Sequence, residues 1–464
     1  MAERNTGRKY AMKIVIIGDG KAGRTFAEEL SKAGHDVTVV DTCASAVQQT
    51  GNDLDILAIE GNGSTLDAQL QAGVDKADLL IATTSTDEMN LLICLIAKKV
   101  GARHTIARVR NPQYRRETNM IKDDLGLSMS INPELICATE IARVLRTPSA
   151  IKVDTFAKGR VEILKLQIGE NSPLNGIRLM EMGKFRARVL VCAVERGKEA
   201  YIPNGGFRLE AGDRISVVTA PKEAAAFLKR TGVQKSPVKE VMIIGGGRIG
   251  YYLARQMVDF GANVKVIDRD PAVCATLAAA LPEAEIICGD GTDYQLLSQE
   301  DVEDMDAVIT LTGFDEQNIL ISLYLREITK AKVITKVSRT SYKSVTDKLG
   351  IDSVFSPRHT AAEVVSRYVR AMANSKGSNV ETLYKIIGDK VEALEFRVKP
   401  GSRVCGVPLT DLPTRPGVLI GSITRGTRVI IPQGQDMIQA GDSVVVVTSI
   451  AGLNDLDDIL EKHR

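Results

Sequence analysis

One glycine-rich pattern occurs twice in this chain, at a fixed separation. The loop GDGKAG at 18–23 follows the apolar run KIVII, and GGGRIG at 245–250 follows VMII. Each copy continues through a second apolar run to an acid, Asp41 in the first and Asp268 in the second. The leading glycines and the two acids are both 227 positions apart. Strand, glycine-rich turn, helix and acid at this spacing predict a Rossmann-type unit, and the repetition predicts two nucleotide sites in one polypeptide.

Bulk composition excludes several other classes of protein. A length of 464 residues gives room for about three or four domains, and 44% hydrophobic residues predict full cores. The formal net charge of +2 predicts no nucleic-acid partner. Apolar runs are too short for a bilayer crossing, and residues 1–11 have no apolar signal core. We therefore expect a cytoplasmic protein, without membrane insertion, that reaches a membrane only by docking on another protein.

The seven cysteines and four histidines carry no metal or disulfide signal. No CxxC pair or His/Cys zinc spacing occurs, and most cysteines lie in apolar segments. This pattern predicts buried, reduced thiols in a reducing compartment. A metal site assembled from carboxylates by folding stays open.

Residues 12–146 alternate between strand-like and helical patterns. Strands are expected at 13–17, 36–40, 55–59, 79–83 and 105–109, with helices at 22–33, 66–72, 88–100 and 113–123. This alternation predicts a doubly wound parallel sheet covered on both faces. A further helix at 131–146 begins with Asn132 as N-cap and Pro133 at its first position.

The chain then changes character and afterwards repeats the whole arrangement. Short strands at 161–168, 189–194, 201–202 and 214–219, with a closing helix at 221–230, predict a small α+β module. After the linker-like stretch 231–239 the pattern restarts, so that GNG at 61–63 returns as GDG at 289–291. The fold class is therefore α/β: two Rossmann-like doubly wound parallel sheets (12–146 and 239–373), each followed by a small module (151–231 and 380–462), by tandem duplication.

The two glycine-rich loops contain the residue types that phosphate binding requires. Gly18 permits the tight turn, Gly20 lets the backbone approach a pyrophosphate, and Gly23 lets the helix pack on the strand. Amides at the helix N-terminus then face the phosphates. Asp41 is placed to accept hydrogen bonds from a ribose diol and disfavours the 2′-phosphate of NADP. The same roles fall to Gly245, Gly247, Gly250 and Asp268 in the second copy. The alternative is that these glycines only terminate strands.

Other loop positions differ between the copies. Asp19 is expected to weaken anion binding unless it faces away, and Gly246 stands in its place in the second loop. Lys21 and Arg248 occupy the fourth loop position and offset negative charge. Arg269, beside Asp268, places a cation near the second ribose position.

Further site candidates follow at the ends of later strands, where ligands bind in open α/β sheets. Asn62 and Asp290, after the third strands, either contact a base edge or form plain turns. Arg108 and Lys336, ending the fifth strands, either reach a phosphate or carboxylate or are ordinary surface charges. The fourth strands end in threonines at the crevice: Thr83 and Thr84 in the first half, and Thr310 and Thr312 in the second.

Two features of the fourth helices have structural explanations. The acid pairs at 87–88 and 315–316 are expected to stabilise the helix N-termini. Each helix also carries an apolar stripe, formed by Leu91, Leu92 and Leu95 in the first half and by Ile319, Leu320 and Leu323 in the second. These stripes are expected to pack in the core, and the alternative is a groove for a partner.

The sequence contains no evident catalytic grouping. Neither small module pairs a histidine with a carboxylate, and no nucleophile elbow or HExxH motif occurs. Two nucleotide sites without such machinery predict a regulatory subunit. Two alternatives remain: an NAD-dependent dehydrogenase with an unrecognised substrate domain, and a scaffold whose loops have lost their ligands.

The motifs together resemble those of the TrkA family of cytoplasmic potassium-uptake subunits and of regulator-of-potassium-conductance (RCK) domains. The matching stretches are KIVIIGDGKAG, VTVVD, EGNGS, TTSTDEMN and IARVR, then MIIGGGRIG, VKVID, CGDGT, TGFDEQN and ITKVSR. The resemblance implies binding of NAD(H) and of ATP or ADP. It also implies a homo-oligomeric ring, which is a dimer or a tetramer of the chain, beneath a membrane-embedded Trk-type transporter subunit on the inner face of the cell membrane.

The resemblance also implies which residues contact the nucleotide. They are Gly18 to Ala22, Asp41, Thr83, Thr84 and Arg108 in the first half, and Gly245 to Ile249, Asp268 and Lys336 in the second. Asp19 stands where the family usually has a small residue, and Lys336 replaces an arginine. Helices at 131–146 and 359–372 are expected to transmit the response to the small modules.

Overall fold

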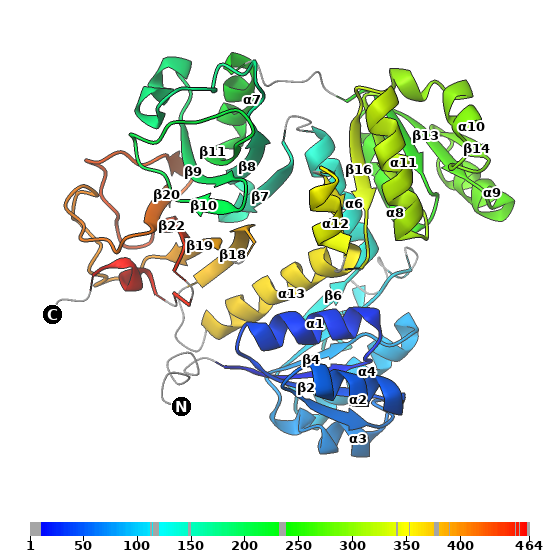
Figure 1. Cartoon of the computed structure of the whole chain (residues 1–464). Coiled ribbons are helices and arrows are strands. Elements are labelled where there is room, and N and C mark those ends of the chain that lie inside the picture. Colours follow the sequence, from blue (N-terminus) through cyan, green and yellow to red (C-terminus); the bar gives the residue numbers. More distant parts are fainter. Residues whose placement is uncertain are drawn as a thin grey trace. The chain divides into compact units, whose positions relative to one another are not determined.

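The computed structural model describes residues 11–461 apart from 112–113, 115–119, 147–149, 232–237, 340–341, 352, 375–379, 389, 451 and 454. The first ten residues and most of the expected helix at 113–123 and of the linker at 231–239 lie outside the described residues. The chain forms two compact units, each built from two separate segments (Figure 1). One unit comprises Met1–Thr139 and Val241–Tyr368, and the other comprises Glu140–Glu240 and Val369–Arg464.

The first unit contains two parallel six-stranded sheets with the same strand order. The first sheet runs β3-β2-β1-β4-β5-β6, from β1 (Lys13–Ile17), β2 (Asp36–Asp41), β3 (Leu57–Glu60), β4 (Leu79–Ala82), β5 (His104–Arg108) and β6 (Met129–Ile131). The second runs β14-β13-β12-β15-β16-β17, from β12 (Glu240–Ile244), β13 (Asn263–Asp268), β14 (Glu285–Cys288), β15 (Ala307–Thr310), β16 (Lys332–Lys336) and β17 (Val354–Phe355). Five strands were predicted for the first sheet; the short sixth strand was missed.

Helices connect these strands, and Figure 1 shows them on both sides of the first sheet. The first set is α1 (Lys21–Lys32), α2 (Ala44–Asp53), α3 (Leu66–Gln71), α4 (Asp87–Val100) and α6 (Pro133–Arg146). The second is α8 (Arg248–Asp259), α9 (Pro271–Ala280), α10 (Tyr294–Gln299), α11 (Asp315–Ile328), α12 (Lys343–Lys348) and α13 (Pro357–Asn374). Helix α2 was not predicted, because its polar second half with Gly51 lacks a helical apolar pattern. Asn132 caps α6 as predicted, accepting a hydrogen bond from the Leu135 amide at 2.9 Å.

The central strands are buried, as a parallel sheet covered by helices requires. In the first sheet, Val15 and Ile17 of β1 belong to the same apolar cluster as Cys94 and Ala97 of α4. The prediction that the apolar stripe of the fourth helices packs in the core was right only in part. Ile319 is 8% exposed and Leu91 packs against the core cluster of the first sheet. Leu92, however, is 45% exposed and Leu320 is 62% exposed. Both lie on the outward sides of helices whose inner positions already fill the core.

The second unit contains two antiparallel sheets with matching topology. The first runs β10-β9-β11-β8-β7, from β7 (Lys152–Phe156), β8 (Val161–Gln167), β9 (Val189–Arg196), β10 (Glu199–Tyr201) and β11 (Arg214–Thr219), with α7 (Pro221–Arg230). The other runs β18-β19-β22-β20-β21, from β18 (Val380–Ile387), β19 (Val391–Arg397), β20 (Val418–Arg425), β21 (Arg428–Ile430) and β22 (Ser443–Thr448). Residues of both sheets share one apolar cluster, in which the Phe156 and Tyr384 rings pack edge to face with centroids 4.8 Å apart.

The duplication extends to an ion pair in each module, between a buried aspartate and a partly exposed arginine. Arg196 donates to both oxygens of Asp213, from Nε at 2.7 Å and Nη2 at 2.8 Å. Arg425 holds Asp442 in the same way, at 2.9 and 2.8 Å. The Asp213 side chain is only 1% exposed and also accepts the Glu210 amide. These forked bonds tie the end of β9 or β20 to the turn before β11 or β22.

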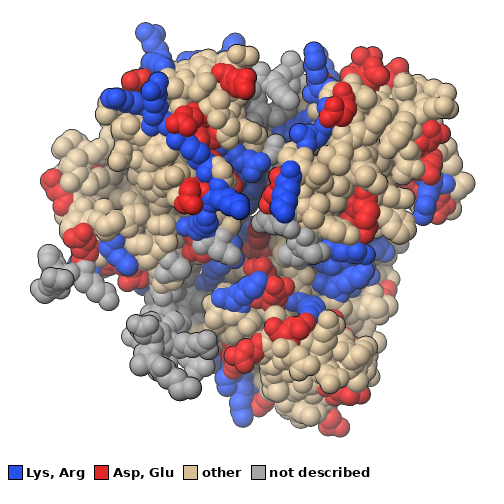
Figure 2. Space-filling model, in the orientation of Figure 1, with Lys and Arg blue, Asp and Glu red and all other residues tan. Residues whose placement is uncertain are grey.

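Charges on the surface are mixed in sign. Figure 2 shows basic and acidic side chains interspersed over one face of the molecule, in keeping with the formal net charge of +2. Among the described helices, none combines the length and the apolar character needed to cross a bilayer.

We predict that Asp213→Asn destabilises its module by about 2 kcal/mol, because a forked, charge-assisted pair loses its charge and one acceptor. Native-state hydrogen exchange of the β8, β9 and β11 amides measures this change. The matched control is Glu210→Gln, which removes the exposed partner of the same arginine and should cost less than about 1 kcal/mol. Equal effects of the two substitutions would contradict the assignment.

Candidate functional site

Both glycine-rich turns have the backbone geometry of a phosphate cradle. Gly18 has φ 101° and Gly245 has φ 113°, values that favour glycine. A Cβ on Gly23 would lie 1.8 Å from the Gly18 carbonyl oxygen, so the helix packs against the turn only because a side chain is absent. Around Gly20, in contrast, no described atom lies within 4 Å of such a Cβ, and the same holds for Gly247. The backbone is thus open to a ligand at one glycine and closed by packing at the next.

Asp41 and Asp268 are held beside these turns by backbone amides. Oδ2 of Asp41 accepts from the Asp19 amide, and Oδ2 of Asp268 accepts from the Gly246 amide, both at 2.6 Å. Their Oδ1 atoms accept from the amides of Cys43 at 2.8 Å and Asp270 at 2.9 Å. Each carboxylate is therefore oriented in advance, and its remaining lone pairs can accept hydroxyl donors.

An asparagine in each fourth helix ties two strand ends together, which the sequence reasoning missed. Asn90 Oδ1 accepts from the Thr84 amide at 2.7 Å and from its hydroxyl at 2.8 Å, while Nδ2 donates to the Arg108 carbonyl at 2.9 Å. Asn318 bonds in the same way to Thr312 and the Lys336 carbonyl. Both asparagines are fully buried. Their recurrence at a separation of 228 was the available signal.

The acids that open these helices also do more than stabilise a helix terminus. Asp87 is buried and its Oδ2 accepts from the amides of Arg110 and Asn111 at 2.9 and 2.8 Å. Asp315 holds the amides of Ser338 and Arg339 likewise, both at 2.9 Å. Each acid therefore fixes the loop that follows β5 or β16 at the edge where the cradle lies.

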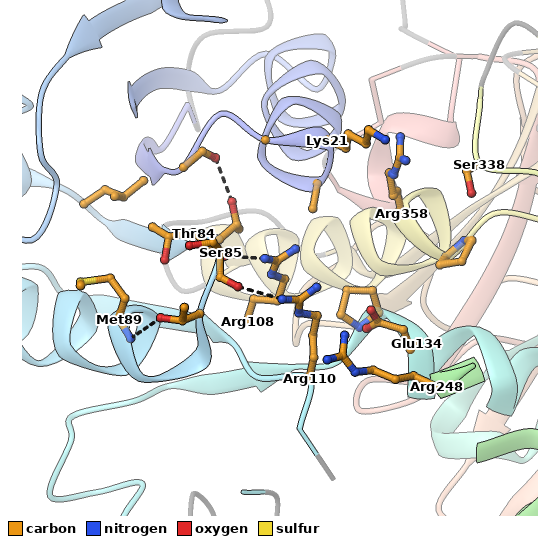
Figure 3. A pocket seen from close by; sticks show the side chains of 18 of the residues that line it. Lys21, Thr84, Ser85, Met89, Arg108, Arg110, Glu134, Arg248, Ser338 and Arg358 are labelled. Atoms are coloured by element: carbon orange, nitrogen blue, oxygen red, sulfur yellow. Dashed lines mark hydrogen bonds between the residues drawn. The ribbon is translucent and has the colours of Figure 1, made fainter. Parts of the chain in front are cut away.

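The two cradles open on one cavity of about 1040 Å³ within the first unit. Its walls come from both halves of the duplication, and Figure 3 shows side chains from each half in the same space. Six cations line it: Lys21, Arg108, Arg110, Arg248, Lys336 and Arg358. The carboxylates that line it are Asp41, Asp268 and Glu134. Cations therefore outnumber acids along the cavity wall.

Several of these groups lack full hydrogen bonding. The buried Nε atoms of Arg108 and Arg110 and the buried Oε2 of Glu134 have no hydrogen-bond partner among the described residues. Arg108 donates from Nη2 to the Thr84 carbonyl, and Lys336 donates to the Thr312 carbonyl. Burial lowers the pKa of Arg108, and the charge of Arg110 lowers it further. Burial also lowers the pKa values of Lys336 and Arg358. Such a set of cations favours an anionic ligand.

Most sequence-predicted site residues line this cavity, but a few do not. Lining positions are Gly18, Gly20, Lys21, Ala22, Asp41, Asn62, Thr83, Thr84, Arg108, Gly245, Gly247, Arg248, Ile249, Gly250, Asp268 and Lys336. Asp19, Gly23 and Gly246 are absent from its wall. The assignment of Thr310 needs correction, because its side chain is fully buried and its hydroxyl lies 3.0 Å from that of Ser322. Leu311 and Thr312 occupy the positions of Thr83 and Thr84.

The residues after the third strands form turns. Asn62 Oδ1 accepts from the amide and the hydroxyl of Ser64, at 3.1 and 2.8 Å. Asp290 does the same with Thr292, at 2.9 and 2.8 Å, and these bonds lower its pKa. Asp290 lines a separate, smaller cavity of about 120 Å³ beside the second cradle, where the Arg269 guanidinium lies 5.9 Å from the Phe314 ring centroid.

Neither a metal-binding cluster nor a disulfide occurs among the described residues. Within the described part of the chain, no group of three or more His, Cys, Asp and Glu side chains is arranged to hold a metal ion. All seven cysteines are free thiols; Cys43 and Cys288 are exposed and the other five are not. Burial raises the pKa of Cys192 to about 12, which leaves it protonated.

Fold and site together define a class of protein: a tandem α/β chain with two nucleotide-type cradles opening on one cation-lined cavity. The TrkA-N domain matches residues 14–133 and 241–357, and the TrkA-C domain matches 163–232 and 393–461. The chain therefore belongs to the TrkA family, with its N and C domains in tandem.

Relatives match over nearly the whole chain. "Trk system potassium uptake protein TrkA homolog 1" of Methanosarcina mazei is 33% identical, covering 96% of this chain and 99% of the relative. The homologue in Archaeoglobus fulgidus is 34% identical, with 97% and 100% covered. Among solved structures, the GsuK RCK domain has a TM-score of 0.63 at 17% identity, with 95% of this chain and 92% of that chain covered. The GsuK channel bound to NAD has a TM-score of 0.62 at 18% identity, with 97% and 79% covered.

We predict effects of very different size for alanine at two glycines of one loop. Gly23→Ala should destabilise the first sheet by about 1–3 kcal/mol or more, because the new methyl group meets the Gly18 carbonyl. Gly20→Ala should change stability by less than about 0.5 kcal/mol, since Gly20 has an extended backbone and open space around it. Thermal unfolding followed by circular dichroism distinguishes the two. An unstable Gly20→Ala variant would show that the loop is closed in solution.

Proposed function

We propose that this protein is a nucleotide-sensing regulatory subunit of a Trk-type potassium transporter. In this proposal it forms a cytoplasmic ring on the inner face of the membrane, bound to the transporter subunit. The observation that carries the proposal is the single cavity onto which two matched cradles open. Family membership supports the potassium-uptake role, because the relatives bear the name Trk system potassium uptake protein. Solved GsuK structures bound to NAD and to ADP support nucleotides of this class as ligands.

The residues present fit an adenine nucleotide with a pyrophosphate. The open backbone at Gly20 and Gly247 allows close approach of phosphate to the loop. Asp41 and Asp268 would accept the ribose hydroxyls, since both carboxylates line the cavity and are already oriented. Lys21, Arg108, Arg248 and Lys336 would neutralise the phosphates. NAD(H), ADP and ATP all meet these requirements.

The mechanism would be a shift of population between two arrangements of the halves. Cations from the two halves crowd the same cavity, and the charges of Arg110 and Arg248 both lower the pKa of Arg108. An anionic ligand between them removes this repulsion and stabilises the arrangement in which cations from both halves line one cavity. A nucleotide that binds one arrangement more tightly shifts the equilibrium by the difference in its two affinities.

Two helices connect the cavity to the rest of the chain. Helix α6 begins at Pro133 and α13 begins at Pro357, and the cavity is lined by these prolines and by Glu134 and Arg358 next to them. The boundary between the two compact units falls within each helix, at 139/140 and at 368/369. A change at the cavity would therefore act directly on the first turn of a helix that continues into the other unit.

We predict that Asp41→Ala and Asp268→Ala each weaken nucleotide binding at one site about tenfold or more, because a charged acceptor for the ribose is lost. Isothermal titration with NAD, ADP and ATP measures each site, and the double variant should lose both. Asp36→Ala, an exposed acid at the start of β2, is the control and should bind as the parent does. Absence of binding to the parent protein would favour a scaffold over a sensor.

We predict that bound NAD undergoes no hydride transfer with hydroxy acids, whereas the chain co-purifies with a membrane-embedded potassium transporter. Absorbance at the reduced-nicotinamide band, followed with a hydroxy-acid panel, measures the first. Affinity purification from membranes with and without ADP or ATP measures the second. Sustained turnover of NAD would favour the dehydrogenase alternative and contradict the proposal.

A further inference from the structure

The two phosphate loops differ at one position, and the difference is matched by a second one beneath the loop. Asp19 of the first loop corresponds to Gly246 of the second, and Thr50 of α2 corresponds to Leu277 of α9; both pairs are 227 positions apart. A Cβ on Gly246 would lie 2.5 Å from Leu277 Cδ1 and 3.2 Å from Asp268 Cβ. The leucine therefore fills the space in the second copy that a smaller threonine leaves to the Asp19 side chain in the first.

Asp19 is buried beneath its loop and does not line the cavity. Neither of its carboxylate oxygens has a hydrogen bond of ordinary geometry to a described residue. Burial raises its pKa, the Thr50 hydroxyl and Arg24 lower it, and the charge of Asp41 raises it. Arg24 is itself paired with Asp53, which reduces the compensation that it offers. An ionised Asp19 is thus a poorly screened negative charge, and its own amide is held by a second acid, Asp41.

A charge in this position acts on phosphates without touching them. The Gly20 backbone, next to Asp19 in the chain, forms the open face of the cradle. Repulsion between a fixed carboxylate and a phosphate group grows with the number of phosphate charges. A dinucleotide pyrophosphate carries fewer charges than the chain of a nucleoside triphosphate, so the triphosphate is penalised more.

We propose that Asp19 is a specificity-determining residue, which makes the first site prefer a pyrophosphate-bridged dinucleotide over a nucleoside triphosphate, while the Gly246–Leu277 site has no such bias. This inference rests on the proposed nucleotide binding. It gives the two copies different selectivity: the first cradle favours a dinucleotide such as NAD, and the second accepts dinucleotides and nucleoside di- or triphosphates alike.

The test removes the charge from the first site and transfers the residue pair of the first site to the second. Asp19→Asn removes the charge and keeps the shape, and it is measured in an Asp268→Ala background, where the weakened second site is separated from the first by its lower affinity. The reciprocal variant, Gly246→Asp with Leu277→Thr, is measured in an Asp41→Ala background. Leu277→Thr alone is the matched control, because it opens the space that an aspartate at 246 would occupy without adding the charge. Titration calorimetry with ATP and NAD gives the ratio of the two affinities for each variant.

Asp19→Asn should raise the affinity for ATP about tenfold and change that for NAD much less. The reciprocal double variant should lower the affinity for ATP at the second site to a similar extent, which keeps the test decisive if the first variant folds poorly. In the unsubstituted first site the preference for NAD should weaken as pH falls, because protonation of Asp19 removes the charge. In Asp19→Asn it should weaken less, because only the terminal phosphate of ATP then takes up a proton.

Unchanged affinity ratios in both Asp19→Asn and the Gly246→Asp, Leu277→Thr double variant would overturn the inference while nucleotide binding stands. Failure of either parent site to bind any nucleotide would overturn the proposed function, and this inference with it.

Discussion

The absence of a side chain at Gly23, and at Gly250 in the second copy, is the constraint on which the rest of the site depends. With no Cβ there, the first helix of each sheet packs directly on the turn before it. That contact leaves the loop amide at 19 or 246 within 2.6 Å of the ribose-type carboxylate on the next strand. Turn, helix N-terminus and carboxylate thus form one rigid assembly, and a larger residue at either glycine would separate all three.

Electrostatics then distinguishes the two assemblies, which share a backbone plan. Cations from both halves occupy a single cavity, and burial lowers the pKa of Arg108, Lys336 and Arg358. Duplication would have given equal charges, yet Glu134 at the start of α6 has Arg358 as its counterpart at the start of α13. The two ligand positions therefore share a fold but differ in local charge. Such asymmetry is what a sensor of two nucleotides would need.

Local features of the site could be predicted from sequence, but long-range ones could not. Glycine spacing, the acid after the second strand and the capping Asn132 depend on residues close along the chain. Asn90 was missed because its partner, the Arg108 carbonyl, is 18 residues away and approaches only through pairing of β4 with β5. Thr310 was assigned wrongly because successive side chains of a strand point to opposite faces. The side chain of Thr310 therefore points into the core, whereas the next residue, Leu311, lines the cavity.

The sequence by itself determined the tandem α/β plan, the two cradles and their acids, since turn geometry and apolar periodicity are encoded within short segments. Only the tertiary structure decided that both cradles open on one cavity and that Arg110, Glu134 and Arg358 line it. It also decided that the Asp19 side chain lies beneath its loop, away from the cavity wall. The reason is that a cavity, and the burial that shifts a pKa, arise from surfaces hundreds of residues apart brought together by packing.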